Sequence, residues 1–419
     1  MRGTFASPAD ELSPERVRAR FAAARRNGFP AWLWPDVAVA EWRAAVDEIA
    51  DVTRRVLAGE SNLMLVCNNS NTMCVAGYTS GMGPLLGYWI EKCVLSATGA
   101  VEDVFRLHLA HNRQRMSRLS EVARAVLEKL AEAGIAPLIL KGMHTAFCYF
   151  PEPGVRPLCD IDVYVAMESM PAAEQVLSDL GYRRTPRTRA PYACDWTIPS
   201  LPREPRTLVY VHRDDPWSLD VQGTLDRRLP TGAQIRLDGL LSRGERAAWP
   251  PCHQARAMQQ PLLALYLAVH VSHTLLNATL LRLAELTWVI RRDREAGTLD
   301  WQEFLNGTAA IGGARFVLPA LALCEQLAPG TIPIDVLVAA RADAPKNLRD
   351  VVAQLTVAGA QPLDRHSFSE RFMWAANWRE RLRQVAGEIA FDGRGRPLKQ
   401  ALYSTGTKLW ALRRHRYSA

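Results

Sequence analysis

The sequence lacks the cysteine spacings that mark structural zinc sites and redox motifs. Its eight cysteines are scattered along 419 residues, and no two of them form a Cys-x-x-Cys pair. Zinc ribbons and thioredoxin-like sites need closely spaced cysteines, so the pattern argues against both classes. We expect mostly structural thiols in a reduced, cytoplasmic setting.

A secretion signal and long apolar runs are also missing. The first residues contain no apolar stretch that would serve as a signal. The most apolar window, residues 261–290, is interrupted by His270, His273, Arg282 and Glu285. A membrane-spanning helix needs about 20 predominantly apolar residues, so this window predicts buried helices and no membrane span.

No glycine-rich nucleotide loop is present. The chain contains neither a Gly-x-Gly-x-x-Gly run nor a Walker-type loop. These loops hold the phosphates of dinucleotides and of P-loop substrates, so neither chemistry has support here.

The excess positive charge lies at one end of the chain. The net charge is +8, and residues 371–419 alone supply it, with eleven Lys and Arg against three acids. A basic tail of this kind can bind nucleic acid through counterion release. A solubilising, partly helical end is the simpler interpretation, and the two stay open.

The periodicity indicates helical ends around a central module that mixes strands with helices. The class is α+β. We predict four regions: a helical and turn-rich N-terminal region (1–100), an α/β module (101–230), a helical domain (231–370) and the basic tail (371–419).

Individual elements follow from the spacing of apolar residues. Residues 61–100 are rich in turn formers, and Gly134 and Gly181 are placed to end helices. Helices are predicted over 14–58, 101–133, 143–150 and 169–180, and almost throughout from about residue 254. Strands are predicted over 135–140, 158–165, 192–198, 207–212 and 218–222, with a turn at 213–216.

Two acids in the second of these strands are the best candidates for chemistry. Asp160 and Asp162 are two residues apart and therefore share one face, while Cys159, Ile161 and Val163 face apolar packing. Carboxylates held this close repel each other unless a cation lies between them. Mg²⁺ accepts carboxylate and phosphate oxygens together, and two such ions can promote an in-line phosphoryl displacement.

An Asp-x-Asp pair alone is common, for example in calcium loops. Its neighbours make it more specific: the preceding strand ends in Lys141-Gly142, and Arg156-Pro157 comes just before the acids.

These pieces together resemble a known family. The ordered run spans about fifty residues, and weaker similarity extends from about residue 101 to about residue 292. It resembles the uncharacterised nucleotidyltransferase family of bacteria, within the DNA polymerase β-like superfamily. The run comprises Gly134-Ile135, Leu138-Ile139-Leu140-Lys141-Gly142, Tyr149, Pro153-Gly154-Val155-Arg156-Pro157, Asp160-Ile161-Asp162-Val163-Tyr164-Val165 and Leu180-Gly181-Tyr182.

The resemblance implies a small mixed sheet flanked by helices, with a third carboxylate on a neighbouring strand. Asp220 is our choice, because its strand alternates between packed and polar positions. Asp214 and Asp215 compete for the role but look like turn residues. The family often has a His-Trp-like pair after this acid, whereas Gln222-Gly223 follows here.

The resemblance also suggests phosphate ligands. Many superfamily members have Gly-Ser where this chain has Lys141-Gly142, the form that the narrower family shows. The glycine would allow close backbone approach, and the lysine would offer a charge to the triphosphate, unless it is only a surface lysine at a strand end. Arg156 would either bind phosphate or orient Asp160 and Asp162 through an ion pair.

Two further pairs lie in the apolar window. His270 and His273 are one helical turn apart, and satisfied core histidines are the favoured interpretation, although the family tends to have a histidine here. Arg282 and Glu285 are most simply an ion pair on a helix surface, or else they line the nucleotide pocket.

The predicted activity is Mg²⁺-dependent transfer of a nucleoside monophosphate from an NTP, ATP included, to an acceptor hydroxyl. Two Mg²⁺ ions would be held by Asp160, Asp162 and Asp220, and the acceptor is a protein, a peptide, a small molecule or an RNA. One alternative is a catalytically degenerate module that binds a nucleotide or a partner. Another is a toxin-like enzyme that modifies tRNA.

Overall fold

The computed structural model describes most of the chain between residues 37 and 383. The predicted strand over 207–212, the first part of the predicted helix over 14–58 and most of the basic tail lie outside the described residues. The described ranges are 37–185, 193–200, 213–229, 233–242, 246–273, 275, 278–358 and 373–383.

The largest sheet in the described part of the chain is mixed and has seven strands, in the order β10-β11-β3-β4-β7-β6-β5. The central strand β4 pairs antiparallel with β3 and parallel with β7. This sheet, with helices before and after it among the described residues, confirms the α+β class. Its strands are β3 (Leu138–Ile139), β4 (Asp160–Tyr164), β5 (Arg183–Thr185), β6 (Ala193–Thr197), β7 (Ser218–Gln222), β10 (Arg246–Trp249) and β11 (Cys252–Met258).

Strand β11 corrects the prediction of helix from about residue 254, and β10 lies just before it, where no strand was predicted. β11 pairs parallel with β3, and β10 pairs antiparallel with β11. Ala255 and Ala257 are buried while Arg256 between them is exposed, which is strand alternation. Alanine favours helix locally, so pairing with β3 overrides the local preference. The sheet therefore takes strands from beyond residue 230, and the predicted domain limits stay predictions.

The segment predicted to be rich in turns is largely helical. It contains α3 (Ser70–Ser80) and α4 (Gly83–Glu91). The Asn69 side chain caps α3 by accepting hydrogen bonds from two backbone N–H groups, and Gly81 ends the helix at φ 77°. Asn69 and Gly81 therefore mark the two ends of a helix, although these residue types had suggested turns.

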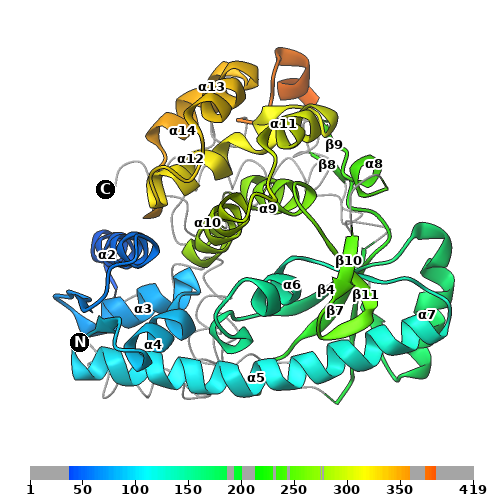
Figure 1. Ribbon diagram of the computed structural model, residues 1–419, viewed down its shortest axis with the longest axis horizontal. Helices are drawn as coiled ribbons and strands as arrows, with labels where there is room; N and C mark the ends of the chain where they lie inside the picture. The colour runs from blue at the N-terminus through cyan, green and yellow to red at the C-terminus, as the bar shows by residue number, and fades with distance from the viewer. Residues whose placement is uncertain are drawn as a thin grey trace, which may run out of the picture.

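The longest described helix, α5 (Gly99–Glu132), runs along the lower side of the molecule in Figure 1, from α3 and α4 to the sheet. Its first half packs with the N-terminal and C-terminal helices in one hydrophobic cluster, and its second half packs with the sheet in another. The predicted helix over 101–133 is thus confirmed, and Gly134 at φ 75° follows its end.

Glycines allow α3 and α4 to lie directly against α5. A Cβ atom on Gly77 would lie 2.3 Å from Cε1 of Phe105, and one on Gly87 would lie 2.2 Å from the Phe105 carbonyl oxygen. Any larger side chain would force the helices apart, so these glycines serve packing.

Helices of the C-terminal half pack above the sheet, with α9 and α10 nearest to it (Figure 1). Among the described residues, no helix is both long and apolar enough to cross a membrane. The further helices are α2 (Val39–Leu57), α6 (Lys141–Cys148), α7 (Met170–Asp179), α8 (Asp238–Leu241), α9 (Leu262–His273), α10 (Leu280–Glu295), α11 (Trp301–Ala310), α12 (Leu318–Leu327), α13 (Ile334–Asp343) and α14 (Lys346–Gln354). Short elements are η3 (Pro153–Val155), η4 (Met167–Ser169), η6 (Ala314–Phe316), the parallel pair β1 (Leu63–Met64) and β2 (Leu95–Ser96), and the antiparallel pair β8 (Arg227–Arg228) and β9 (Gln234–Ile235).

Candidate active site

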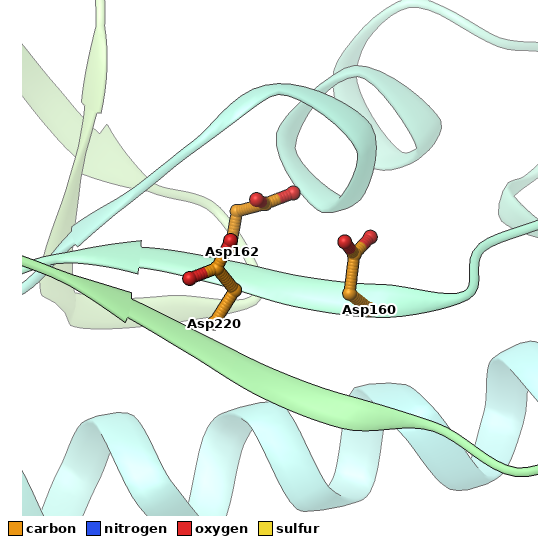
Figure 2. Close-up of side chains that lie close together, drawn as sticks. All are labelled: Asp160, Asp162 and Asp220. Carbon is orange, nitrogen blue, oxygen red and sulfur yellow. The ribbon is translucent and has the colours of Figure 1, made fainter. Parts of the chain in front are cut away.

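Three carboxylates meet on the two central parallel strands. Asp160 and Asp162 lie on β4, and Asp220 lies on β7 directly opposite Asp162 in the strand register. One ligand oxygen from each lies within 4.8 Å of the others. Figure 2 shows the three side chains on the same side of the strands. The sequence prediction that these acids come together is therefore correct in geometry, including the choice of Asp220.

Alternation along both strands holds the acids in place. Ile161 and Val163 of β4 are buried in the hydrophobic cluster on the other face of the sheet. Leu219 and Val221 of β7 are buried in the same hydrophobic cluster. Burial of these side chains fixes which face each strand turns to the core. Cys159 departs from the expected packing, because it precedes the strand and is exposed.

Asp214 and Asp215, which competed with Asp220 for the role of third acid, lie outside the cluster. Asp214 forms an ion pair with Arg118 at 3.2 Å, in the turn before β7. The backbone oxygen of Asp215 accepts a hydrogen bond from Arg115. Neither belongs to the cluster of three carboxylates.

Lys141 supplies positive charge to the cluster. It is the first residue of α6, and its Nζ lies 2.9 Å from Oδ1 of the buried Asp162. Burial and the neighbouring Asp160 raise the pKa of Asp162 to about 7, although Lys141 acts to lower it. Burial alone would lower the pKa of Lys141, and the two aspartates reverse the direction. Lys141 is therefore not the surface lysine of the alternative interpretation, and its phosphate-binding role stays a prediction.

Gly142 lies where a side chain would not fit. A Cβ atom there would lie 2.5 Å from Cδ2 of Leu158 and 2.8 Å from Nη1 of Arg156. The glycine therefore lets the start of α6 approach the segment before β4. Its predicted role in phosphate binding stays a prediction.

Arg156 is engaged by a carboxylate that we expected on the surface. Its Nε and Nη2 atoms donate to the two carboxylate oxygens of Glu285 at 3.0 and 2.8 Å, and Nη1 donates to the Pro157 carbonyl. Glu285, on α10, is only 3% exposed and also accepts a hydrogen bond from Thr145 of α6. The predicted surface position of Glu285 is therefore wrong, and its pairing with Arg282 stays a prediction. The phosphate-binding role of Arg156 stays a prediction.

Gln222 and Arg227 belong to the site, and we had not predicted a role for either. Gln222 Nε2 donates to Asp220 at 3.0 Å and reaches Asp162 at 3.4 Å. Arg227 Nη2 in turn donates to Gln222 Oε1 at 2.6 Å. Gln222 thus hydrogen-bonds to two of the acids. It follows Asp220 where the resemblance led us to expect a His-Trp-like pair. The sequence could have indicated this contact, because Gln222 lies two residues after Asp220 and therefore on the same face of the strand.

A cavity of about 190 Å³ adjoins the acids. Arg227, Tyr266, His270 and His273 line it, together with Asp220. His270 is half-buried and His273 is exposed, so the interpretation as a core histidine is wrong for His273. Burial raises the pKa of Tyr266 to about 12, which keeps its hydroxyl protonated at neutral pH. Tyr266 gave no sequence signal, because the packing of α9 against the sheet is a long-range contact.

The donor set of the cluster suits a hard divalent cation. All three ligands are carboxylates, and Lys141 offsets one of the three negative charges when all are ionised. Mg²⁺ prefers such oxygen ligands, completed by water and substrate phosphate. Exposed acidic groups often gather without a metal, but Asp162 and Asp220 are 3% and 4% exposed. Burying like charges together costs free energy that a cation offsets.

Comparison with known proteins agrees with this chemistry. No curated protein matches the chain, and no solved structure matches it. One family does match, over residues 78–329, which is more than half of the chain and includes all three acids. The chain therefore belongs to the uncharacterised nucleotidyltransferase family.

Proposed function

We propose that the protein transfers a nucleoside monophosphate from an NTP to an acceptor hydroxyl, with Mg²⁺ held by Asp160, Asp162 and Asp220. The observation that carries the proposal is the in-register placement of Asp220 opposite Asp162, with the three carboxylates within 4.8 Å. Membership of a nucleotidyltransferase family supports the same reaction class. A cytoplasmic setting and one or two metal ions belong to the same proposal.

The residues divide the work as follows. Bound Mg²⁺ would neutralise charge on the phosphates and favour ionisation of an attacking hydroxyl. Asp160 and Asp162 hold the metal from β4, and Asp220 holds it from β7. Lys141 adds charge for the phosphates, and Gln222 orients the carboxylates of Asp162 and Asp220 by its hydrogen bonds.

The test measures Mg²⁺-dependent pyrophosphate release and label transfer from labelled NTPs, with protein, peptide and tRNA acceptors. Asp160→Asn, Asp162→Asn and Asp220→Asn each lower the rate by at least about 100-fold, as expected when charge stabilisation of the transition state is lost. Asp179→Asn on the exposed end of α7 is the matched control and keeps the parent rate. Equal rates in all variants would contradict the proposal.

Calorimetry separates catalysis from binding alone. Mg²⁺-dependent NTP binding without pyrophosphate release, across all acceptors, would identify the degenerate binding module instead. A missing third acid would favour this alternative, whereas Asp220 lies in the cluster, which supports catalysis. Nucleic acid binding by the basic tail stays a prediction, because that segment lies almost wholly outside the described residues.

A further inference from the structure

The cavity beside the carboxylates lies at one particular side of the cluster. Of the three acids, only Asp220 lines it, together with Lys141 and Gln222. Its other walls come from α9 and from the segment that follows β7. The cavity is therefore a recess that opens next to the third carboxylate.

Arg227 is held rigidly in the wall of this recess. Its Nη1 donates to the backbone oxygens of Thr224 and Asp226 at 3.1 Å, and its Nη2 donates to Gln222. A guanidinium has five N–H groups. These three bonds, the ones that it makes within the described part of the chain, leave two donors in a fixed orientation. Such a fork matches the oxygens of a phosphate or carboxylate.

The other polar groups of the wall favour the same ligand chemistry. Lys141, which is paired with Asp162, also lines it, and His270, His273 and Tyr266 add imidazole and hydroxyl groups, with Asp220 as the one acid in the lining. The volume of about 190 Å³ is below the range of roughly 300–1,000 Å³ that whole small-molecule sites occupy. The recess therefore fits one small group of a larger substrate.

We propose that this recess is an oxyanion subsite, in which Arg227, His270 and His273 hold a phosphate or carboxylate group of a substrate next to Asp220. The group belongs either to the NTP, as a terminal phosphate, or to the acceptor, near the hydroxyl that is modified. Assigning the owner rests on the proposed function, whereas anion binding by the recess does not.

Calorimetry with inorganic phosphate and tripolyphosphate, without Mg²⁺, tests the subsite itself. We expect the parent to bind at least one probe, and Arg227→Met to weaken binding by about tenfold or more, since charge-assisted hydrogen bonds are lost. Arg227→Lys keeps the charge and recovers part of the affinity. The matched control is Arg228→Met, because Arg228 is exposed and does not line the recess.

A second variant avoids any dependence on the bonds of Arg227. His273 is the exposed last residue of α9, so His273→Glu adds a carboxylate to the wall with little effect on folding. It should weaken binding of the probes strongly, whereas His273→Gln removes the imidazole without adding a charge and should weaken binding less. If the parent binds neither probe, or if Arg227→Met and Arg228→Met bind equally, the subsite is wrong.

ATP and AMP with Mg²⁺ then identify the owner of the group. Weaker ATP binding with unchanged AMP binding in Arg227→Met assigns the recess to the terminal phosphates. Loss of probe binding with parent-like ATP and AMP binding assigns it to the acceptor. Failure of the parent to bind NTP, with probe binding intact, would overturn the proposed function and leave the subsite standing.

Discussion

Arg156 and Glu285 neutralise each other inside the protein, through two parallel hydrogen bonds. We predict that Glu285→Gln lowers the free energy of unfolding by about 3–5 kcal/mol, because it leaves a buried guanidinium without its counter-ion. Urea unfolding measures this effect. The double variant Arg156→Met/Glu285→Met should lose less than the sum of the single changes, since no buried charge remains. Additive losses would show that the two side chains do not act as a pair.

A second stability prediction concerns the close packing at Gly142. Gly142→Ala should cost about 1–3 kcal/mol of stability, because its Cβ would overlap Leu158 and the Arg156 guanidinium. Thermal unfolding is the measurement. Gly99→Ala is the matched control, since a Cβ atom there meets nothing within 4 Å. Equal melting temperatures for the two variants would argue against close packing at the start of α6.

At the scale of elements, α5 buries an ionisable side chain among the helices that it contacts. His108 is fully buried beside Tyr78, at 4.1 Å between ring centroids, and burial lowers its pKa to about 3. Between about pH 3 and pH 6.5, His108 is therefore protonated in the unfolded chain and neutral in the folded protein. Stability should fall as the pH drops below about 6.5, the pKa of an exposed histidine, until about pH 3.

Between pH 7 and pH 5 this residue should cost about 2 kcal/mol of stability. Urea unfolding of the parent and of His108→Gln at both pH values checks the size, since the other titrating groups cancel in the comparison. The glutamine variant should show the smaller pH dependence. The same pH dependence in both proteins would mean that His108 is protonated in the fold or screened from this effect.

The elements near the site differ in how far the sequence predicts them. β4, β7 and α5 follow from local periodicity, which places Asp160 and Asp162 on one face. The expectation that a third acid joins them came from the family resemblance, and the alternation of β7 then favoured Asp220. Strands β10 and β11 could not be predicted in this way, because alanines prefer helix until a partner strand is present. Pairing of Arg156 with Glu285 was missed for a related reason. It joins residues 129 positions apart, and only packing of α10 brings them together.

At the scale of the whole molecule, the family match begins within α3 and ends just beyond α12. It thus includes all of α5, which packs into both hydrophobic clusters. We infer that the helices around the sheet are part of the unit that supports the site, and not an addition to it. Glu285 of α10 binds Arg156, which lies just before the acids in the sequence, and His270 of α9 lines the recess.

Ligand binding should therefore stabilise the molecule as a whole. NTP with Mg²⁺ at about 100 times its Kd adds about 2.7 kcal/mol, which raises Tm by roughly 3 °C in a protein of 419 residues. Differential scanning calorimetry is the measurement. Asp162→Asn should abolish the Mg²⁺-dependent part, and Asp179→Asn should keep it. An equal shift in both variants would place the metal elsewhere.

The pairing of β4 with β7 gives the site an all-or-none character. Asp162 faces Asp220 only in one register, with Ser218 opposite Asp160 and Gln222 opposite Tyr164. Sliding β7 by one residue would turn Asp220 into the apolar layer and bring Leu219 and Val221 to the polar side. Inserting a single residue between Trp217 and Asp220 should thus erase the third ligand completely, however conservative the added side chain. The spacing of the strand is as much a part of the chemistry as the carboxylates themselves.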